Sequence, residues 1–217
     1  MTNSAVVNNS VEHFNSSFGP GIVVRSFSSS PTNVSLTNCS IRRTNKCGAA
    51  LWVEAGGPLD LSLTNSNVNQ NNGVEAVRGP YNYMCGGLGG GVFLYCDQSS
   101  GSLTADLKNS IFWGNKRWDG SGTDLEMMTG SSNTCTQLTV NADHNDIGQR
   151  LTSSGTFNDL GGNIAANPLV SVSRVHLKAG SPCIDTGTCM GAPTTDFEGD
   201  PRPSGAGCDM GADEFVP

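Results

Sequence analysis

Charged and aromatic residues are scarce in this chain, making up 14% and 6% of its 217 residues. Its 12 lysines and arginines are outnumbered by 19 acids, and they form no basic stripe. A nucleic-acid partner is therefore unexpected, because such binding depends on cationic side chains that neutralise phosphates. No apolar run approaches the roughly 20 residues of a membrane-spanning helix, so we expect no membrane span.

Motifs for metal binding and for export are also missing. Only three histidines are present and no Cys-x-x-Cys pair occurs among the eight cysteines, so the cysteines are poorly placed to bind zinc. No signal peptide is recognisable, since Met1 leads directly into repeat sequence. We therefore expect a mature or trimmed chain whose natural N-terminus lies upstream.

The eight cysteines favour disulfides formed in an oxidising compartment over buried free thiols. This indicates a secreted or cell-surface protein. Eight cysteines allow many connectivities, and spacing alone does not choose among them. The closest spacings suggest three local pairs, Cys39–Cys47, Cys85–Cys96 and Cys183–Cys189.

What the sequence does contain is a short pattern of alternating apolar and small polar residues that ends in asparagine. It occurs at 34–38 and again at 61–65. Such alternation is typical of a strand with one buried face, and asparagine at a fixed position indicates a turn. We expect the asparagine side chains to bond to the backbone and to one another within the turns. Aligned copies place them at Asn3, Asn38, Asn65, Asn109 and, as a further candidate, Asn141.

Two further features follow the asparagines. An apolar residue stands three positions later, at Val6, Ile41, Val68 and Phe112. A glycine-rich stretch then leads into a second strand, at 22–24, 51–53, 92–94 and 125–127, and a third strand closes the repeat. Strands this short cannot bury a face alone, but stacked coils of three strands bury one continuous core.

Two parts of the chain resemble known bacterial proteins. The heptad 109–115 and the glycine run at 89–91 resemble repeats of bacterial surface proteins, including polymorphic outer-membrane-protein-like repeats, and the pattern over residues 3–150 resembles the parallel β-helix of the pectate lyase-like superfamily. The segments 163–170, 175–187, 196–203 and 208–215 resemble the C-terminal module of choice-of-anchor Q domain proteins, which are secreted β-helix proteins.

This resemblance implies an all-β, right-handed parallel β-helix, a solenoid of about four to five coils. Residues 1–150 would form the coils, and residues 151–217 an irregular C-terminal capping module of the same domain. The first coil would expose a core end and unpaired strand edges. We therefore expect upstream coils or an oligomer partner to cover the N-terminal end.

Aromatic residues on the second strands form the main candidate for ligand binding. Alternation points Trp52, Phe93 and Tyr95 outward on neighbouring coils, which lie about 4.8 Å apart. Such a strip suits the apolar faces of sugar rings, so a polysaccharide or surface glycan is the expected partner. The alternative is that the loop 71–90 folds over the strip and buries it. Nearby loops add four further candidates, Arg78, Tyr81, Tyr83 and Trp118.

Whether the protein is an enzyme stays open at this point. Lyases of the resembled superfamily need a basic residue and a partner for the uronate carboxylate, whereas hydrolases need two or three carboxylates across a groove. No motif surrounds the residues of these types, and solvated loop charge is the alternative interpretation. The weak catalytic candidates are Asp106, Lys116, Arg117, Asp119, Asp124 and Glu126.

Calcium is the one cofactor that the sequence suggests. Asp196, Glu198 and Asp200 have the odd-position spacing of a calcium loop, but the later bidentate glutamate is missing. Arg202 could pair with these acids instead. A structural calcium ion and an arginine–carboxylate network are therefore the alternatives.

Three functions are compatible with these observations. The first is a non-catalytic, glycan-binding or adhesin-like protein that is secreted or bound to the cell surface. The second is a polysaccharide lyase or glycoside hydrolase that acts in a groove on the side of the helix, a hypothesis that rests on fold analogy alone. The third is a structural C-terminal end-cap of a longer β-helix protein.

Overall fold

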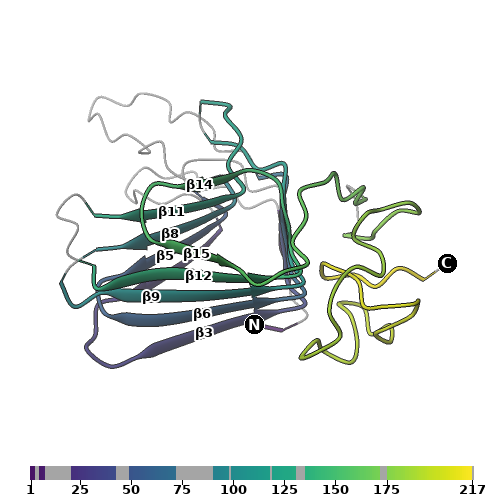
Figure 1. Ribbon diagram of the computed structural model, residues 1–217, viewed down its shortest axis with the longest axis horizontal. Helices are drawn as coiled ribbons and strands as arrows, with labels where there is room; N and C mark the ends of the chain where they lie inside the picture. The colour runs from purple at the N-terminus through teal and green to yellow at the C-terminus, as the bar shows by residue number, and fades with distance from the viewer. Residues whose placement is uncertain are drawn as a thin grey trace.

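The computed structural model describes residues 1–2, 5–7, 21–42, 49–71, 90–97, 99–117, 119–130, 135–171 and 175–216. Within these ranges the chain is all-β and contains no helix (Figure 1). The candidates Arg78, Tyr81, Tyr83 and Trp118 lie outside the described residues.

The strands form three parallel sheets of five strands each. The first sheet contains β1 (Ala5–Val7), β4 (Ser40–Arg42), β7 (Asn67–Asn69), β10 (Ile111–Trp113) and β13 (Asp146–Ile147). The second contains β2 (Ile22–Ser26), β5 (Leu51–Ala55), β8 (Val92–Cys96), β11 (Leu125–Thr129) and β14 (Arg150–Thr152). The third contains β3 (Thr32–Thr37), β6 (Pro58–Thr64), β9 (Ser102–Lys108), β12 (Gln137–Asp143) and β15 (Thr156–Asp159).

The chain visits the three sheets in turn, so each sheet receives every third strand. One passage through all three sheets is called a circuit below. β14 and β15 pair with β11 and β12, so the stack of circuits continues beyond residue 150. The predicted all-β class with stacked parallel strands is confirmed at this level.

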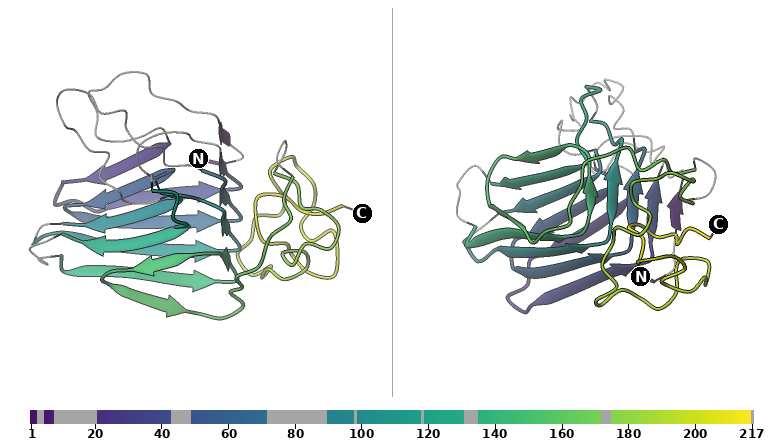
Figure 2. Two further views of the ribbon diagram at one scale, coloured as in Figure 1. Left: turned by 90° about the horizontal axis from the view of Figure 1, so that it is seen from above. Right: turned by 45° about the vertical axis from the view of Figure 1, so that its right-hand side comes forward.

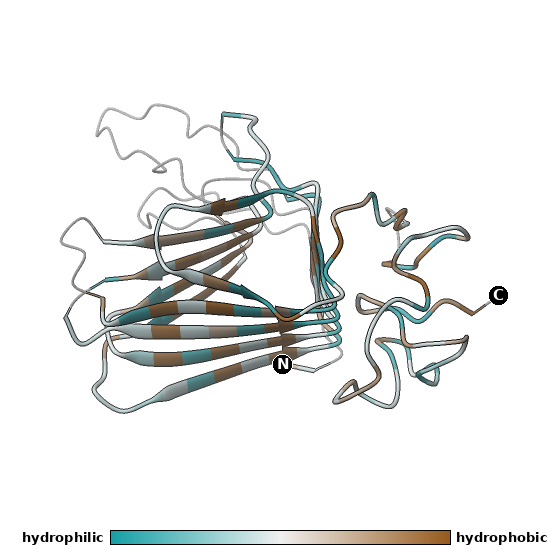
Figure 3. Cartoon of the chain, in the orientation of Figure 1, coloured by the Kyte–Doolittle hydropathy of each residue, from teal (hydrophilic) through white to brown (hydrophobic). Residues whose placement is uncertain are grey.

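The core lies between the sheets and is built from apolar side chains that repeat at the same position in successive circuits (Figure 3). In the third sheet, Leu36, Leu63 and Leu107 are paired in register and each is at most 2% exposed. In the first sheet, the predicted positions Ile41, Val68 and Phe112 are likewise in register and buried. Stacking therefore buries faces that a single three-residue strand could not bury.

The turns after the third-sheet strands confirm part of the predicted asparagine series. Asn38, Asn65 and Asn109 adopt φ values of 50°, 45° and 46°, a left-handed conformation that asparagine tolerates better than most residues. The fourth position is His144, with φ 52°, and the prediction of Asn141 is wrong. Asn141 lies within β12, because the pairing of Asp143 with Lys108 places the turn three residues later.

Residues 160–171 and 175–216 lie along the side of the stack, against the outer face of the first sheet, and not across its end (Figures 1 and 2). A second apolar cluster joins Ile111 of β10 to Leu177, Cys183 and Met210. This C-terminal segment contacts several circuits at once, which a cap over the last circuit could not do.

The turn asparagines hold the C-terminal segment in place. The Asn38 amide donates to Thr195 O at 2.7 Å, the Asn65 amide to Asp209 O at 3.2 Å, and the Asn109 amide to Thr188 O at 2.6 Å. Asn109 also donates to Asn65 Oδ1 of the neighbouring circuit at 3.3 Å. The expected bonds to backbone and between neighbours are present, and the backbone acceptors belong to the C-terminal segment.

Disulfides join Cys96 to Cys135 and Cys189 to Cys208. Cys39 and Cys183 are buried free thiols, so all three predicted local pairs are wrong. The physical reason is the stack itself, since residues 39 positions apart can approach to a Cα–Cα distance of 5.6 Å in adjacent circuits. Cys47 and Cys85 lie outside the described residues.

Candidate functional site

The outward face of the second sheet carries the predicted aromatic residues in the predicted register. Trp52 of β5 is paired with Phe93 of β8, and their ring centroids are 4.6 Å apart with an interplanar angle of 57°. The ring of Tyr95, two residues further along β8, stacks on Phe93 with a centroid separation of 5.9 Å. Trp52, Phe93 and Tyr95 therefore form one continuous group, called the aromatic cluster below.

The three rings differ in exposure. Phe93 is 0% exposed, whereas Trp52 and Tyr95 are each partly exposed. Phe93 therefore supports its neighbours and offers no open ring face of its own. The cluster presents two partly exposed rings to solvent, in place of the fully open strip expected from alternation alone.

Charged groups border the aromatic cluster on the same face. Arg25 Nε lies 2.9 Å from Glu54 Oε2, and Glu54 is paired in register with Tyr95. Burial, followed by the charges of Asp97 and Glu54, raises the pKa of the Tyr95 phenol. The phenol thus stays protonated at neutral pH and donates a hydrogen bond to the Asp97 carboxylate.

The candidate Asp124 has a structural role. Its carboxylate accepts hydrogen bonds from the Asn115 backbone N–H at 2.8 Å, the Asn115 side-chain amide at 2.7 Å and the Gln149 backbone N–H at 2.7 Å. The residue is 2% exposed, and burial raises its pKa although these hydrogen bonds oppose the rise. Asp124 therefore fixes a turn between circuits, and both of its carboxylate oxygens accept hydrogen bonds from the protein.

Glu126 and Arg117 form an ion pair of 2.7 Å on the outward side of β11. The Glu126 side chain is 1% exposed, so the carboxylate is buried as well as paired with Arg117. Arg117 belongs to a short hairpin, in which its N–H donates to Ser121 O at 2.8 Å. The ion pair thus anchors this hairpin to the second sheet.

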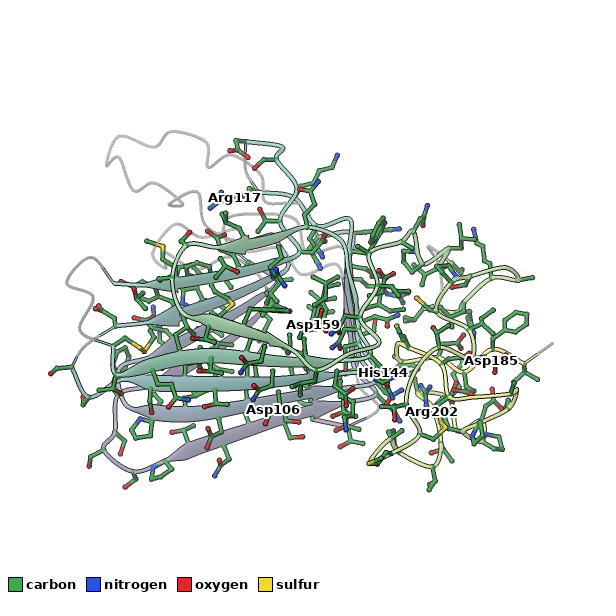
Figure 4. The ribbon with its side chains drawn as sticks, viewed as in Figure 1. Asp106, Arg117, His144, Asp159, Asp185 and Arg202 are labelled. Atoms are coloured by element: carbon green, nitrogen blue, oxygen red, sulfur yellow. A yellow bond between two sulfur atoms is a disulfide. The ribbon has the colours of Figure 1, made fainter. Side chains whose placement is uncertain are left out.

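The remaining catalytic candidates lie apart. Asp119 is exposed and accepts hydrogen bonds from the Ser121 hydroxyl and N–H, which lower its pKa. Lys116 is exposed in the same hairpin. Asp106 lies on the third sheet, where Asn141 donates to it at 2.8 Å (Figure 4). Among the described candidates, Asp124 and Glu126 are buried and bonded to protein groups, and Asp106 belongs to another sheet. A two-carboxylate glycosidase needs two accessible carboxyl groups on either side of a groove.

The calcium candidates are arranged differently from a calcium loop. Asp196 Oδ1 accepts the backbone N–H groups of Glu198, Gly199 and Asp200, and Asp196 Oδ2 accepts that of Glu214. Both oxygens of this carboxylate are therefore directed at amides of its own turn and of the chain end.

Arg202 forms the centre of the alternative network. Its Nη1 lies 2.7 Å from Glu214 Oε2, and its guanidinium also donates to Asp209 O and Gly211 O. An arginine–carboxylate network of the expected kind is therefore present. Its partner is Glu214, not the acids of the 196–200 stretch.

Two further groups went unrecognised in the sequence. Asp146 is 0% exposed and lies 3.5 Å from the thiol of Cys183, between the first sheet and the C-terminal segment. His176 lies between Asp213 and Glu198. No local signal could have identified either group, because the partners are separated by 22 or more residues and no repeat relates them.

The buried Asp146 predicts a dependence of stability on pH. Burial raises its pKa to about 6, above the ordinary value of 3.8 that applies to the unfolded chain. The folded chain favours the protonated carboxyl group, which stabilises the fold below pH 4. This contribution is lost as the pH rises through 6 and the buried group ionises. Replacing Asp146 with asparagine should therefore raise the melting temperature more at pH 7 than at pH 4. A difference between variant and wild type that stays constant across this range would contradict the assignment.

Comparison with known proteins gives this chain no relative: no family model matches it, and neither curated proteins nor solved structures yielded a match. The described residues contain no helix long and apolar enough to cross a membrane.

Proposed function

We propose that the protein is a secreted or cell-surface, right-handed parallel β-helix protein that binds glycans without catalysis. Three parallel sheets that each take every third strand support this fold. The resemblance of the C-terminal segment to the choice-of-anchor Q module supports the same family of β-helix proteins. Two disulfides are more typical of extracellular proteins than of cytosolic ones.

The observation that carries glycan binding is the aromatic cluster. Trp52 and Tyr95 are partly exposed on a sheet face and are held by the buried ring of Phe93. A rigid aromatic surface packs against the apolar face of a sugar ring at a low cost in conformational entropy. The neighbouring Arg25–Glu54 pair supplies a hydrogen-bond donor and an acceptor for hydroxyl groups.

We propose a non-catalytic role because the described acids near the aromatic cluster are already bonded to groups of the protein. Asp124 is occupied by three hydrogen bonds, and Glu126 is buried and paired with Arg117. A general acid or base needs access to substrate at hydrogen-bond distance. A binding protein needs no such acid, and the aromatic cluster alone suffices for it.

A glycan array followed by titration of the best ligand tests this proposal. Replacing Trp52 with alanine should weaken binding by about tenfold or more, equivalent to about 1.4 kcal/mol. Replacing Leu151 with alanine is the matched control, because Leu151 is also exposed on the outer face of the second sheet and lies outside the aromatic cluster. Unchanged affinity in the Trp52 variant, or an array without any bound glycan, would refute the proposal.

A further inference from the structure

The C-terminal segment brings one histidine and two acids together from three places in the sequence. Asp213 Oδ1 lies 2.9 Å from His176 Nδ1, and Glu198 Oε2 lies 3.4 Å from His176 Nε2. One ligand atom from each of the three residues lies within 4.8 Å of the other two. None of these contacts is used by the aromatic cluster or by the Arg202 network.

The charges of this group are unbalanced when the histidine is neutral. A neutral imidazole has one N–H and one lone pair, so it can donate to only one of the two carboxylates. Its other nitrogen then presents a lone pair to an acid oxygen. Among the described residues, the ion pairs of Glu198 and Asp213 are both with His176. A cation held between the three residues would pair with both carboxyl groups and with the lone pair of the imidazole.

The surroundings hold the three residues in place while leaving one side open. Asp213 is 6% exposed, and its second oxygen accepts the Leu177 N–H at 2.8 Å. The turn that carries Glu198 is fixed by Asp196, which accepts the Glu198 N–H at 2.8 Å. The side chains of Glu198 and His176 are 49% and 32% exposed, so an ion can enter from solvent and Glu198 can adjust to it.

The ligand types select the kind of ion. One imidazole nitrogen and two carboxylate oxygens suit a borderline ion such as Zn²⁺, whereas Ca²⁺ prefers oxygen ligands alone and needs six to eight of them. A tetrahedral Zn²⁺ with bonds of about 2.0–2.2 Å sets its ligand atoms roughly 3.4 Å apart. In this structure the two acids contact different ring nitrogens, so an ion bound to Nδ1 beside Asp213 would require Glu198 to move round from Nε2. The side chain of Glu198 is 49% exposed, which leaves it room for that movement.

We propose that His176, Glu198 and Asp213 bind a divalent transition-metal ion of the Zn²⁺ type, with water in the fourth position. This differs from the calcium loop expected at 196–200, because only Glu198 is shared between the two ligand sets. The ion would connect three turns of the C-terminal segment and so stabilise its attachment to the first sheet.

Calorimetric titration of the untagged, EDTA-dialysed full chain with ZnCl₂ tests the proposal. We expect one site per chain and a melting temperature that rises with Zn²⁺ concentration. Replacing His176 with alanine should abolish this site, and replacing Glu198 with glutamine should weaken it by about tenfold or more. The exposed Glu198 is the safer variant, since its substitution removes no buried contact.

Replacing His144 with alanine provides the matched control. His144 Nδ1 also contacts an acid, Asp143, at 2.6 Å, but the partner of that acid is Lys108 at 3.2 Å, so the local charge is already balanced. This variant should retain full Zn²⁺ binding. The proposal fails if the wild type binds no Zn²⁺, if the His176 and Glu198 variants bind as the wild type does, or if CaCl₂ competes equally. The first two outcomes would make the group a set of histidine–carboxylate contacts that binds no ion, and the third would make it a site without preference for Zn²⁺.

Discussion

Replacing Arg202 with methionine is expected to lower the free energy of unfolding by about 3–5 kcal/mol. The side chains of Arg202 and Glu214 are 0% and 1% exposed, and their charged atoms lie 2.7 Å apart. Methionine fills similar volume but leaves the Glu214 carboxylate buried without its cation. The variant also loses the guanidinium bonds to Asp209 O and Gly211 O, so two carbonyls of the final turn lose a donor.

Urea denaturation measures this loss directly, with limited proteolysis to locate the region that opens. Replacing Arg25 with methionine is the control, because its Arg25–Glu54 pair has side chains 38% and 16% exposed and should contribute less than about 1 kcal/mol. Equal destabilisation by the two substitutions would show that burial does not determine how much each ion pair contributes to the free energy of unfolding. Because the C-terminal segment contacts three circuits through Asn38, Asn65 and Asn109, its loss should expose the first sheet as well.

The sequence predicted the repeat well because the signal is local. Glycine-rich entries and alternating residues placed Trp52 beside Phe93, and the structure has that register. Asparagine marked the left-handed turn correctly at 38, 65 and 109. The asparagine pattern failed in the fourth circuit because His144 adopts the left-handed conformation there. Asn141, which lies within β12, gave a false match.

The parts that sequence reasoning missed are contacts between distant positions. Alternation points Phe93 outward, but alternation does not state what covers that face, and Phe93 is fully buried. Residue type identified Arg202 as an ion-pair partner, yet its acid is Glu214, twelve positions away in a chain end without regular strands. His176 offered no signal at all, since its acids are brought to it only by the folding of the C-terminal segment.

Opening the Cys96–Cys135 disulfide is expected to lower the free energy of unfolding by about 4 kcal/mol, because the bond closes a loop of 39 residues in the unfolded chain. The Cys189–Cys208 disulfide, with a separation of 19 residues, should contribute about 3 kcal/mol. Urea denaturation with and without a reductant gives the sum of these two contributions when Cys47 and Cys85, which lie outside the described residues, are replaced with serine.

The contribution of the Cys96–Cys135 bond is isolated in a variant with alanine at Cys189 and Cys208 and serine at Cys47 and Cys85, the two cysteines outside the described residues. Any remaining effect of reductant then belongs to the Cys96–Cys135 bond. Its thiols stay in place on reduction, so no packing volume is lost and the measured change reflects the cross-link itself. Cys39 and Cys183 are already free thiols and should not respond. If reductant left the stability of this variant unchanged, the stacked circuits alone would hold β8 to the turn before β12, and the disulfide would add nothing to the fold.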